Sequence, residues 1–151
     1  MLWNILQAYD GKLPEDIRVI FCNTGLEHAA TYEFLREMAD RWDVAIDWIE
    51  YALDDAGEHD FKAVDFETAA RDGEPFTQLI EKKGYLPNPV ARVCSSNLKM
   101  RTLDRYLKTL PAFADGYTNA IGLRADEPNR AQRIKSDNGR EAIICPLYDA
   151  G

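Results

Sequence analysis

The sequence has few cysteines, and the three that it has, Cys22, Cys94 and Cys145, form no C-x-x-C pair. They are too scattered for a disulfide framework or a zinc site, which predicts reduced thiols. No apolar run approaches the roughly 20 residues needed to cross a bilayer, and the first residues lack the basic start and cleavage site of a signal peptide. These absences predict a cytoplasmic protein without a membrane partner, and a length of 151 residues predicts a single domain.

Glycine-rich phosphate-binding patterns are also missing, because the nine glycines are isolated and no Gly-x-Gly-x-x-Gly or Gly-x-x-x-x-Gly-Lys-Ser/Thr pattern occurs. Positive charge is scarce and uneven. Residues 1–91 carry 8 basic and 19 acidic side chains, a net charge of −11, whereas residues 92–151 carry 10 and 7, a net charge of +3. An acidic protein repels a long polyanion, so this local reversal favours a small anionic ligand and leaves nucleic-acid binding undetermined.

The apolar periodicity predicts alternating helices and strands. Helical spacing covers residues 2–10, 26–42, 74–83, 98–110 and 125–134, and β-rich runs cover 17–22, 44–51 and 117–123, with an edge strand or extended segment at 61–66. The strand, helix and strand between residues 17 and 51 form a βαβ unit, which carries a parallel sheet. We therefore expect one α/β domain, with a parallel sheet flanked by helices.

The turn Asn23-Thr24-Gly25 follows the first predicted strand, where open α/β sheets bind their ligands. A helix N-terminus at this position offers free N–H groups to an anion. Gly25 allows close backbone approach, and Asn23 and Thr24 offer hydrogen-bonding groups to a base or ribose. The alternative is that Asn23 or Thr24 only caps the helix.

A second turn of this form, Arg124-Ala-Asp126-Glu127, follows the strand predicted at 117–123. Arg124 and Arg130 are suited to clamp phosphate or sulfate with bidentate hydrogen bonds. The alternative is an exposed helix that carries ion pairs of Arg130 with Asp126 and Glu127.

Four segments carry a family resemblance. In order they are Val19-Ile-Phe-Cys-Asn23-Thr24-Gly25-x-Glu27-x3-Thr31-x2-Phe34, Val64-Asp-Phe-Glu-Thr-Ala-x2-Asp72-Gly-Glu-Pro-Phe76, Pro87-Asn-Pro-Val-Ala-Arg92-x-Cys94-x4-Lys99-x-Arg101-Thr and Ile121-Gly-Leu-Arg124-Ala-Asp-Glu127-x2-Arg130. Together they resemble the phosphoadenosine phosphosulfate reductase family, particularly its phage-encoded and related bacterial members, over nearly the whole chain. The resemblance implies a Rossmann-like fold of the adenine nucleotide alpha-hydrolase type that binds a nucleotide at the strand ends.

The resemblance also implies a set of site residues. Nucleotide contacts fall on Asn23, Thr24, Gly25, Glu27 and Thr31, and phosphate or sulfate contacts fall on Lys99, Arg101, Arg124, Asp126, Glu127 and Arg130. The implied ligand is an adenine nucleotide, either adenosine phosphosulfate or ATP. Asp126 or Glu127 offers hard oxygen ligands to Mg²⁺ bridging the phosphates. A reductant protein such as thioredoxin is the implied partner.

The sequence departs from the family in its cysteines and its phosphate loop. The family's Ser-Gly-Gly-x-x-Ser loop and C-terminal cysteine do not occur here, which predicts a fragment whose oxidoreductase activity depends on a longer chain that carries the loop. Cys94 remains the candidate redox nucleophile, because Arg92, Lys99 and Arg101 favour a nearby thiolate. The alternative is a packing residue.

The same departures bear on cofactors and assembly. Cys94 and Cys145 do not complete the four ligands of an iron–sulfur cluster, so no cluster is expected. Apart from the Mg²⁺ contact of Asp126 or Glu127, no residue is assigned to a metal site. A sheet that lacks its first strand has an open edge, which predicts a homodimer.

Three functions are open at this point. The first is a sulfonucleotide reductase-like enzyme of sulfur metabolism that acts on adenosine phosphosulfate or ATP. The second is an ATP pyrophosphatase-type enzyme in the sulfur modification of nucleic acid. The third is a degenerate, non-catalytic binding module, which the missing phosphate loop favours.

Overall fold

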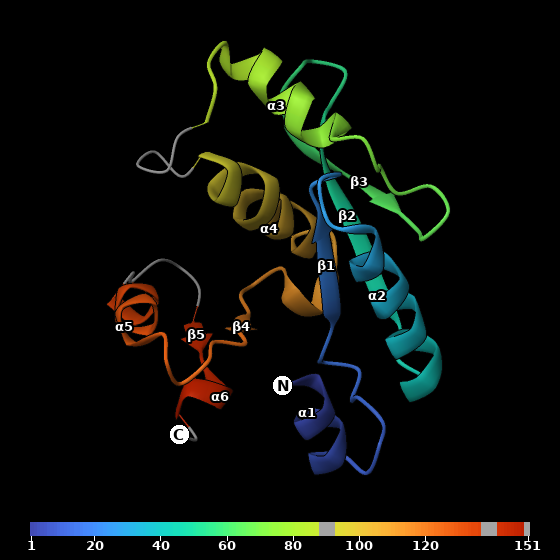
Figure 1. Cartoon of the computed structure of the whole chain (residues 1–151), viewed down its shortest axis with the longest axis vertical. Helices are drawn as coiled ribbons and strands as arrows, with labels where there is room; N and C mark the ends of the chain where they lie inside the picture. The colour runs from blue at the N-terminus through green and yellow to red at the C-terminus, as the bar shows by residue number, and fades with distance from the viewer. Residues whose placement is uncertain (88–92, 137–141, 150–151) are drawn as a thin grey trace.

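The computed structural model describes residues 1–87, 93–136 and 142–149 (Figure 1). The predicted loop at Leu86 to Pro89 lies partly outside them. In chain order the elements are α1 Leu2–Ala8, β1 Val19–Asn23, α2 Ala29–Trp42, β2 Ile46–Leu53, β3 His59–Val64, α3 Glu74–Lys83, the π-helix η1 Ser95–Arg101, α4 Thr102–Leu107, the 3₁₀-helix η2 Pro111–Phe113, β4 Thr118–Ala120, α5 Pro128–Ser136, β5 Ala142–Ile144 and α6 Pro146–Asp149. Among the described helices, none combines the length and apolarity that a bilayer-crossing segment needs.

The main sheet has the order β1-β2-β3. β1 and β2 are parallel, with Asn23 opposite Glu50, so the predicted βαβ unit is confirmed. β3 is antiparallel to β2, since the connection at 54–58 is a tight turn that is too short for a crossover. The Asp54 side chain closes this turn by accepting from the backbone N–H of Glu58 at 2.8 Å. The expectation of a parallel sheet was therefore wrong for the third strand.

The two faces of the main sheet are covered by different helices. Alternate residues of a strand point to opposite faces, so β2 contributes Trp48 to one face and Tyr51 to the other. Trp48 packs with Tyr32 of α2 and with Phe21, whose ring centroid lies 4.9 Å from that of Trp48. Tyr51 packs with Leu79 of α3 and with residues around η1. Figure 1 shows α2 on one side of the sheet and α4 on the other.

The helix predicted at 98–110 begins and ends earlier than expected, and its first part is a π-helix that continues into α4. Polar side chains bond to the backbone inside this stretch: Asn97 donates to the carbonyl of Val93 at 3.0 Å, and Thr102 donates to the carbonyl of Asn97 at 2.8 Å. Both side chains are buried. These two bonds add side-chain donors to backbone carbonyls of the stretch.

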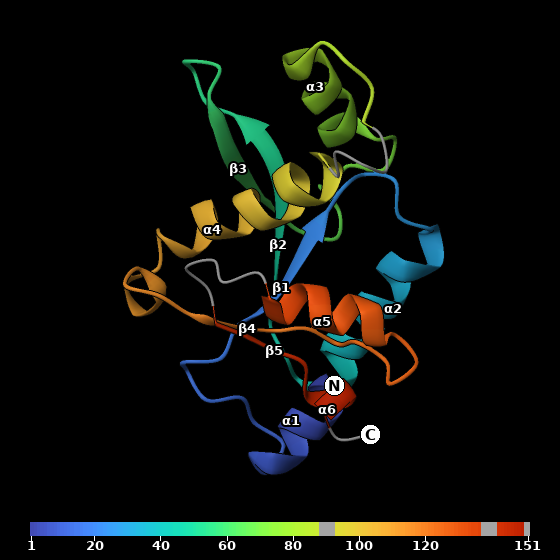
Figure 2. The same ribbon diagram turned by 90° about the vertical axis from the view of Figure 1, so that its left-hand side faces the viewer.

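The last third of the chain forms a second small sheet of two parallel strands, β4 and β5. Its core consists of Leu123, Ala131 and Cys145, all fully buried. Figure 2 shows α5 beside these strands, apart from the carboxyl end of β1. The strand predicted at 117–123 is thus shorter and belongs to a separate sheet.

Candidate functional site

The turn after β1 is organised by the side chain of Asn23, which is fully buried. Its Nδ2 donates to Glu50 Oε1 at 2.7 Å and to the carbonyl of Ala70 at 2.9 Å. Its Oδ1 accepts from Gly25 N and from the Tyr32 hydroxyl, both at 3.0 Å. A side-chain amide has two donors and two acceptor positions, so the protein uses all of them. Asn23 was expected to contact a nucleotide, but its side chain instead fixes the shape of the turn.

Gly25 packs against a second glycine. It has a φ of 75°, and a Cβ added to it would lie 3.0 Å from the Cα and N of Gly73, which has a φ of 82°. The close backbone approach expected at Gly25 is therefore present, but the partner is the loop that precedes α3. This contact joins the turn after β1 to the N-terminus of α3.

Thr24, Glu27 and Lys99 lie together at the carboxyl end of β1. The Thr24 hydroxyl donates to Glu27 Oε1 at 3.1 Å, and Lys99 Nζ lies 3.9 Å from the same oxygen. Lys99 comes from η1, which packs against β1 so that the Cys22 thiol lies 3.9 Å from the Lys99 carbonyl. The side chain of Lys99 is 52% exposed and that of Glu27 is 27% exposed. The structure thus brings together three of the predicted site residues.

The start of α2 is capped by His28, whose Nδ1 accepts from the N–H of Ala30 at 3.1 Å. The capping role considered for Asn23 or Thr24 therefore belongs to His28. Thr31 lies in the first turn of α2, where its N–H bonds to the His28 carbonyl at 2.8 Å, and its side chain is half-buried. Thr31 is near the candidate turn in sequence and lies on the helix that follows it.

Arg101 does not share the position of Lys99, although only one residue separates them. Residues two apart on a helix do not face each other. The Arg101 guanidinium donates to the side chain of Asn97 at 3.2 Å, and it lines a hollow of about 420 Å³ with Lys108 and Tyr117. The two cations expected to bind one phosphate or sulfate group therefore point to different parts of the surface.

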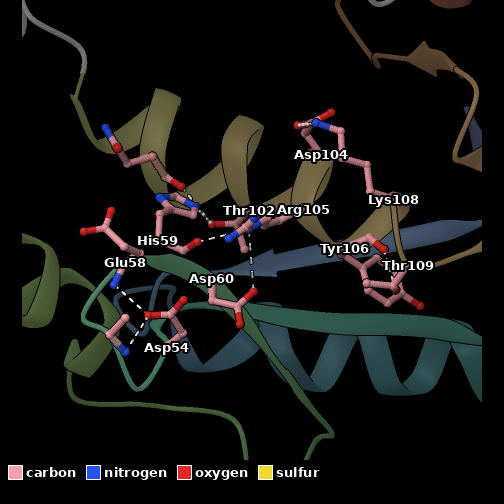
Figure 3. Close-up of polar contacts among 12 residues, drawn as sticks. Asp54, Glu58, His59, Asp60, Thr102, Asp104, Arg105, Tyr106, Lys108 and Thr109 are labelled. Carbon is pink, nitrogen blue, oxygen red and sulfur yellow. Dashed lines mark hydrogen bonds and ion pairs between the residues drawn. The ribbon is translucent and has the colours of Figure 1, made fainter.

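Polar contacts attach α4 to β3 near this hollow (Figure 3). His59 Nε2 lies 3.3 Å from the Thr102 hydroxyl, which already donates its proton to a backbone carbonyl, so the imidazole Nε2–H donates here. Arg105 donates to the His59 carbonyl at 3.1 Å and lies 3.8 Å from Asp60. Burial, and then the charges of Arg101 and Arg105, lower the pKa of His59. These contacts give His59 a role in docking α4 on the sheet.

The residues from Arg124 to Arg130 lie outside the turn after β1. Arg124 makes two hydrogen bonds to the Asp126 carboxylate, at 2.8 and 2.9 Å, and its side chain is 75% exposed. Arg130 bonds to Glu127 at 2.9 Å, and hydrogen bonds from Arg130 and the Arg124 backbone lower the pKa of Glu127. In both views α5 and the second sheet lie apart from the carboxyl end of β1, so the expected convergence of this segment with Asn23-Thr24-Gly25 is not seen (Figures 1 and 2). The structure contains the exposed ion pair of Glu127 with Arg130, which was the alternative to a phosphate or sulfate clamp.

The three cysteines differ in environment. Burial raises the pKa of the Cys22 thiol to about 11, although Lys99 opposes this. Cys145 is fully buried, and Cys94 is partly exposed but packs against the core around Tyr51 and Leu79. Packing contacts therefore exist for all three thiols.

We expect Cys94 to react first with a thiol reagent in the folded protein. At pH 8 a thiol with a pKa of about 11 is ionised in about one molecule in a thousand, and Cys145 is inaccessible. Brief exposure to Ellman's reagent or iodoacetamide, followed by peptide mass spectrometry, measures the order of labelling. Cys94→Ser should leave only slow labelling that accelerates in urea. Initial labelling at Cys22 would contradict the structure.

Arg71 is a residue near the site that the sequence did not single out. Its guanidinium lies 3.7 Å from the ring centroid of Tyr32, and the neighbouring Ala70 bonds to both Asn23 and Glu50. The only sequence signal was its place within the family-like segment from Val64 to Phe76. In the described part of the chain, no group of three or more His, Cys, Asp or Glu side chains is placed to hold a metal ion.

No family model and no solved structure matches the chain. It is similar to the uncharacterized nin region protein ORF290 of Escherichia phage lambda, with 30% identity over 136 residues. The match covers 86% of this chain and 45% of the phage protein, so the chain spans less than half the length of this relative. The likeness to phosphoadenosine phosphosulfate reductases stays a prediction from the sequence.

Proposed function

We propose that the chain binds an adenine nucleotide, adenosine phosphosulfate or ATP, at the carboxyl end of β1, as the nucleotide-binding part of a sulfonucleotide reductase-like protein. The observation that carries this proposal is the position of Lys99, which η1 delivers to the turn after β1. Open α/β sheets bind ligands at this end of their strands. A cation at this position would also allow an acidic protein to bind an anionic ligand.

The Lys99 ammonium is available to a ligand. At 3.9 Å from Glu27 Oε1, it is beyond hydrogen-bonding distance of that oxygen, although the two charges still attract. Its N–H donors can therefore turn to a phosphate or sulfate oxygen. Thr24 and the Glu27 carboxylate lie beside it, and a carboxylate accepts hydrogen bonds from ribose hydroxyls. Charge for the anion and acceptors for the sugar thus occur at one place.

Binding, rather than thiol chemistry, is the role that we assign to these residues. Cys94 packs with Phe76 and Leu53 against the core on the α3 side of the sheet. This packing supports the structural interpretation of Cys94 over its use as a redox nucleophile.

Calorimetric titration with adenosine 3′-phosphate 5′-phosphosulfate, ATP and AMP tests the proposal. We expect at least one of them to bind, and we expect Lys99→Ala to weaken its binding about tenfold, the effect of losing one charge-assisted contact. Lys82→Ala is the matched control, because Lys82 is also an exposed lysine near one glutamate, Glu58, at 3.4 Å. Absence of binding by all three nucleotides, or equal losses in the two variants, would refute the site.

The same titration on Arg124→Ala tests the second cationic segment. Its guanidinium already pairs with Asp126 and lies outside the turn, so we expect the affinity to stay that of the unmodified chain. A tenfold loss would mean that residues 124–130 reach the nucleotide after all.

A further inference from the structure

The Arg71 guanidinium is held in place by aromatic rings next to the candidate site. Its central carbon lies 3.7 Å from the ring centroid of Tyr32 and 4.8 Å from that of Phe66. It also donates a hydrogen bond to the Phe66 carbonyl at 2.5 Å. Stacking on an aromatic face orients the planar guanidinium and reduces the entropy lost when it binds a ligand.

These rings belong to the structure that supports the turn after β1. The Tyr32 hydroxyl bonds to Asn23 Oδ1 at 3.0 Å and lies 3.3 Å from the Ala70 carbonyl, directly before Arg71. Burial raises the pKa of the Tyr32 hydroxyl. The Arg71 charge lowers this pKa and the Glu27 charge raises it, so both groups lie near the hydroxyl. Arg71 therefore lies at the end of the sheet that carries Glu27 and Lys99.

The Arg71 guanidinium has hydrogen-bond donors that are available to a ligand. Within the described residues, no carboxylate oxygen lies within 4.0 Å of its guanidinium nitrogens. Of its five N–H donors, one bonds to the Phe66 carbonyl. Arg36 offers a contrast, because it lies 4.1 Å from the centroid of Phe66 but pairs with Glu33. Two arginines thus contact the ring of Phe66, and among the described residues only Arg36 of the two has an acidic partner.

We propose that Arg71 is an anion-binding residue that receives a phosphate or sulfate group of the ligand at the turn after β1, an assignment that rests on the proposed nucleotide site. A fixed guanidinium matches two oxygens of such a group with parallel hydrogen bonds. Arg71 and Lys99 then supply the positive charge of this site from two segments that are distant in the sequence.

Titration with inorganic pyrophosphate and with the nucleotide that binds best tests Arg71. We expect Arg71→Gln to weaken pyrophosphate binding about tenfold or more, which corresponds to one charge-assisted contact. Arg71→Lys should recover only part of the affinity, because it keeps the charge but loses the planar fork. Arg36→Gln is the matched control, since it removes a guanidinium from the same ring and should bind as the unmodified chain does. Thermal unfolding of each variant checks that the fold is kept.

The outcomes separate this assignment from the nucleotide proposal. Pyrophosphate binding that depends on Arg71, without binding of any nucleotide, keeps the anion site and refutes the nucleotide function. Nucleotide binding that needs Lys99 but is unchanged in folded Arg71→Gln keeps the function and overturns the role of Arg71. Equal losses in the Arg71→Gln and Arg36→Gln variants also overturn it, and so does a chain that binds neither ligand.

Discussion

Replacing Asn23 with alanine should lower the free energy of unfolding by about 2–4 kcal/mol, because several buried polar groups, one of them a carboxylate, lose a hydrogen-bond partner together. Asn23 and Glu50 are 0% and 4% exposed, and their side chains are 2.7 Å apart. The alanine variant leaves the Glu50 carboxylate with one donor fewer and leaves the carbonyl of Ala70 and the N–H of Gly25 without this partner. Urea denaturation followed by circular dichroism measures the change.

Asn23→Asp provides a control that is sensitive to charge. The substitution keeps the shape of the side chain but places a second carboxylate beside Glu50, and two like charges at this distance cannot both be ionised without cost. We expect the aspartate variant to be unstable at pH 7 and to recover part of the difference at pH 5. A loss below 1 kcal/mol in Asn23→Ala would show that the network does not hold the turn.

Replacing Gly25 with alanine should cost about 2–4 kcal/mol of folding free energy, from backbone strain and overpacking together. A left-handed φ of 75° costs an alanine part of this. The larger part comes from contact with Gly73, because the Cβ would lie 3.0 Å from backbone atoms that cannot move aside as a flexible side chain can. The same denaturation experiment measures the loss.

Gly57→Ala separates the two contributions. Gly57 has a φ of 73°, almost that of Gly25, but a Cβ there meets nothing within 4 Å. Its replacement should cost only about 1 kcal/mol, the strain of the backbone conformation alone. Equal losses at Gly25 and Gly57 would mean that the contact between the two glycine loops contributes nothing.

Both of these residues were expected to meet a ligand, and the structure gives them a supporting role. Asn23 and Gly25 hold the turn on which Thr24 and Glu27 lie, and that turn faces Lys99. Variants of Asn23 or Gly25 that remain folded should therefore bind nucleotide more weakly, although neither side chain is expected to contact the nucleotide. The candidate site depends on its buried support as well as on its exposed side chains.

Local patterns in the sequence predicted much of the secondary structure. The helix expected at 74–83 has those bounds, since Pro75 favours its first turn and Gly84 ends it with a φ of 72°. The pairing of β1 with β2 followed from their apolar strands and the helix between them. Phe34 shows the limit of periodicity: it fits a helical face, but it is 62% exposed because Tyr32 faces the sheet instead.

The site was less predictable, because neighbours in sequence diverge and distant residues meet. Lys99 and Arg101 look like one cationic pair in the sequence, but the π-helix directs only Lys99 to the turn. Arg71 lies in an acidic stretch, and only the stacking on Tyr32 distinguishes it from a solvated surface arginine.

The sequence by itself determined the α/β class, the parallel pairing of the first two strands and the turn that ends β1, because apolar periodicity and turn residues act over short stretches of chain. Only the tertiary structure decided that β3 is antiparallel to β2 and that Glu50 and Ala70 accept both side-chain donors of Asn23. It also decided that Lys99 and Arg71 lie near the turn after β1 while Arg124 does not. Those outcomes depend on which faces pack together, and packing brings together residues whose separation along the chain carries no local signal.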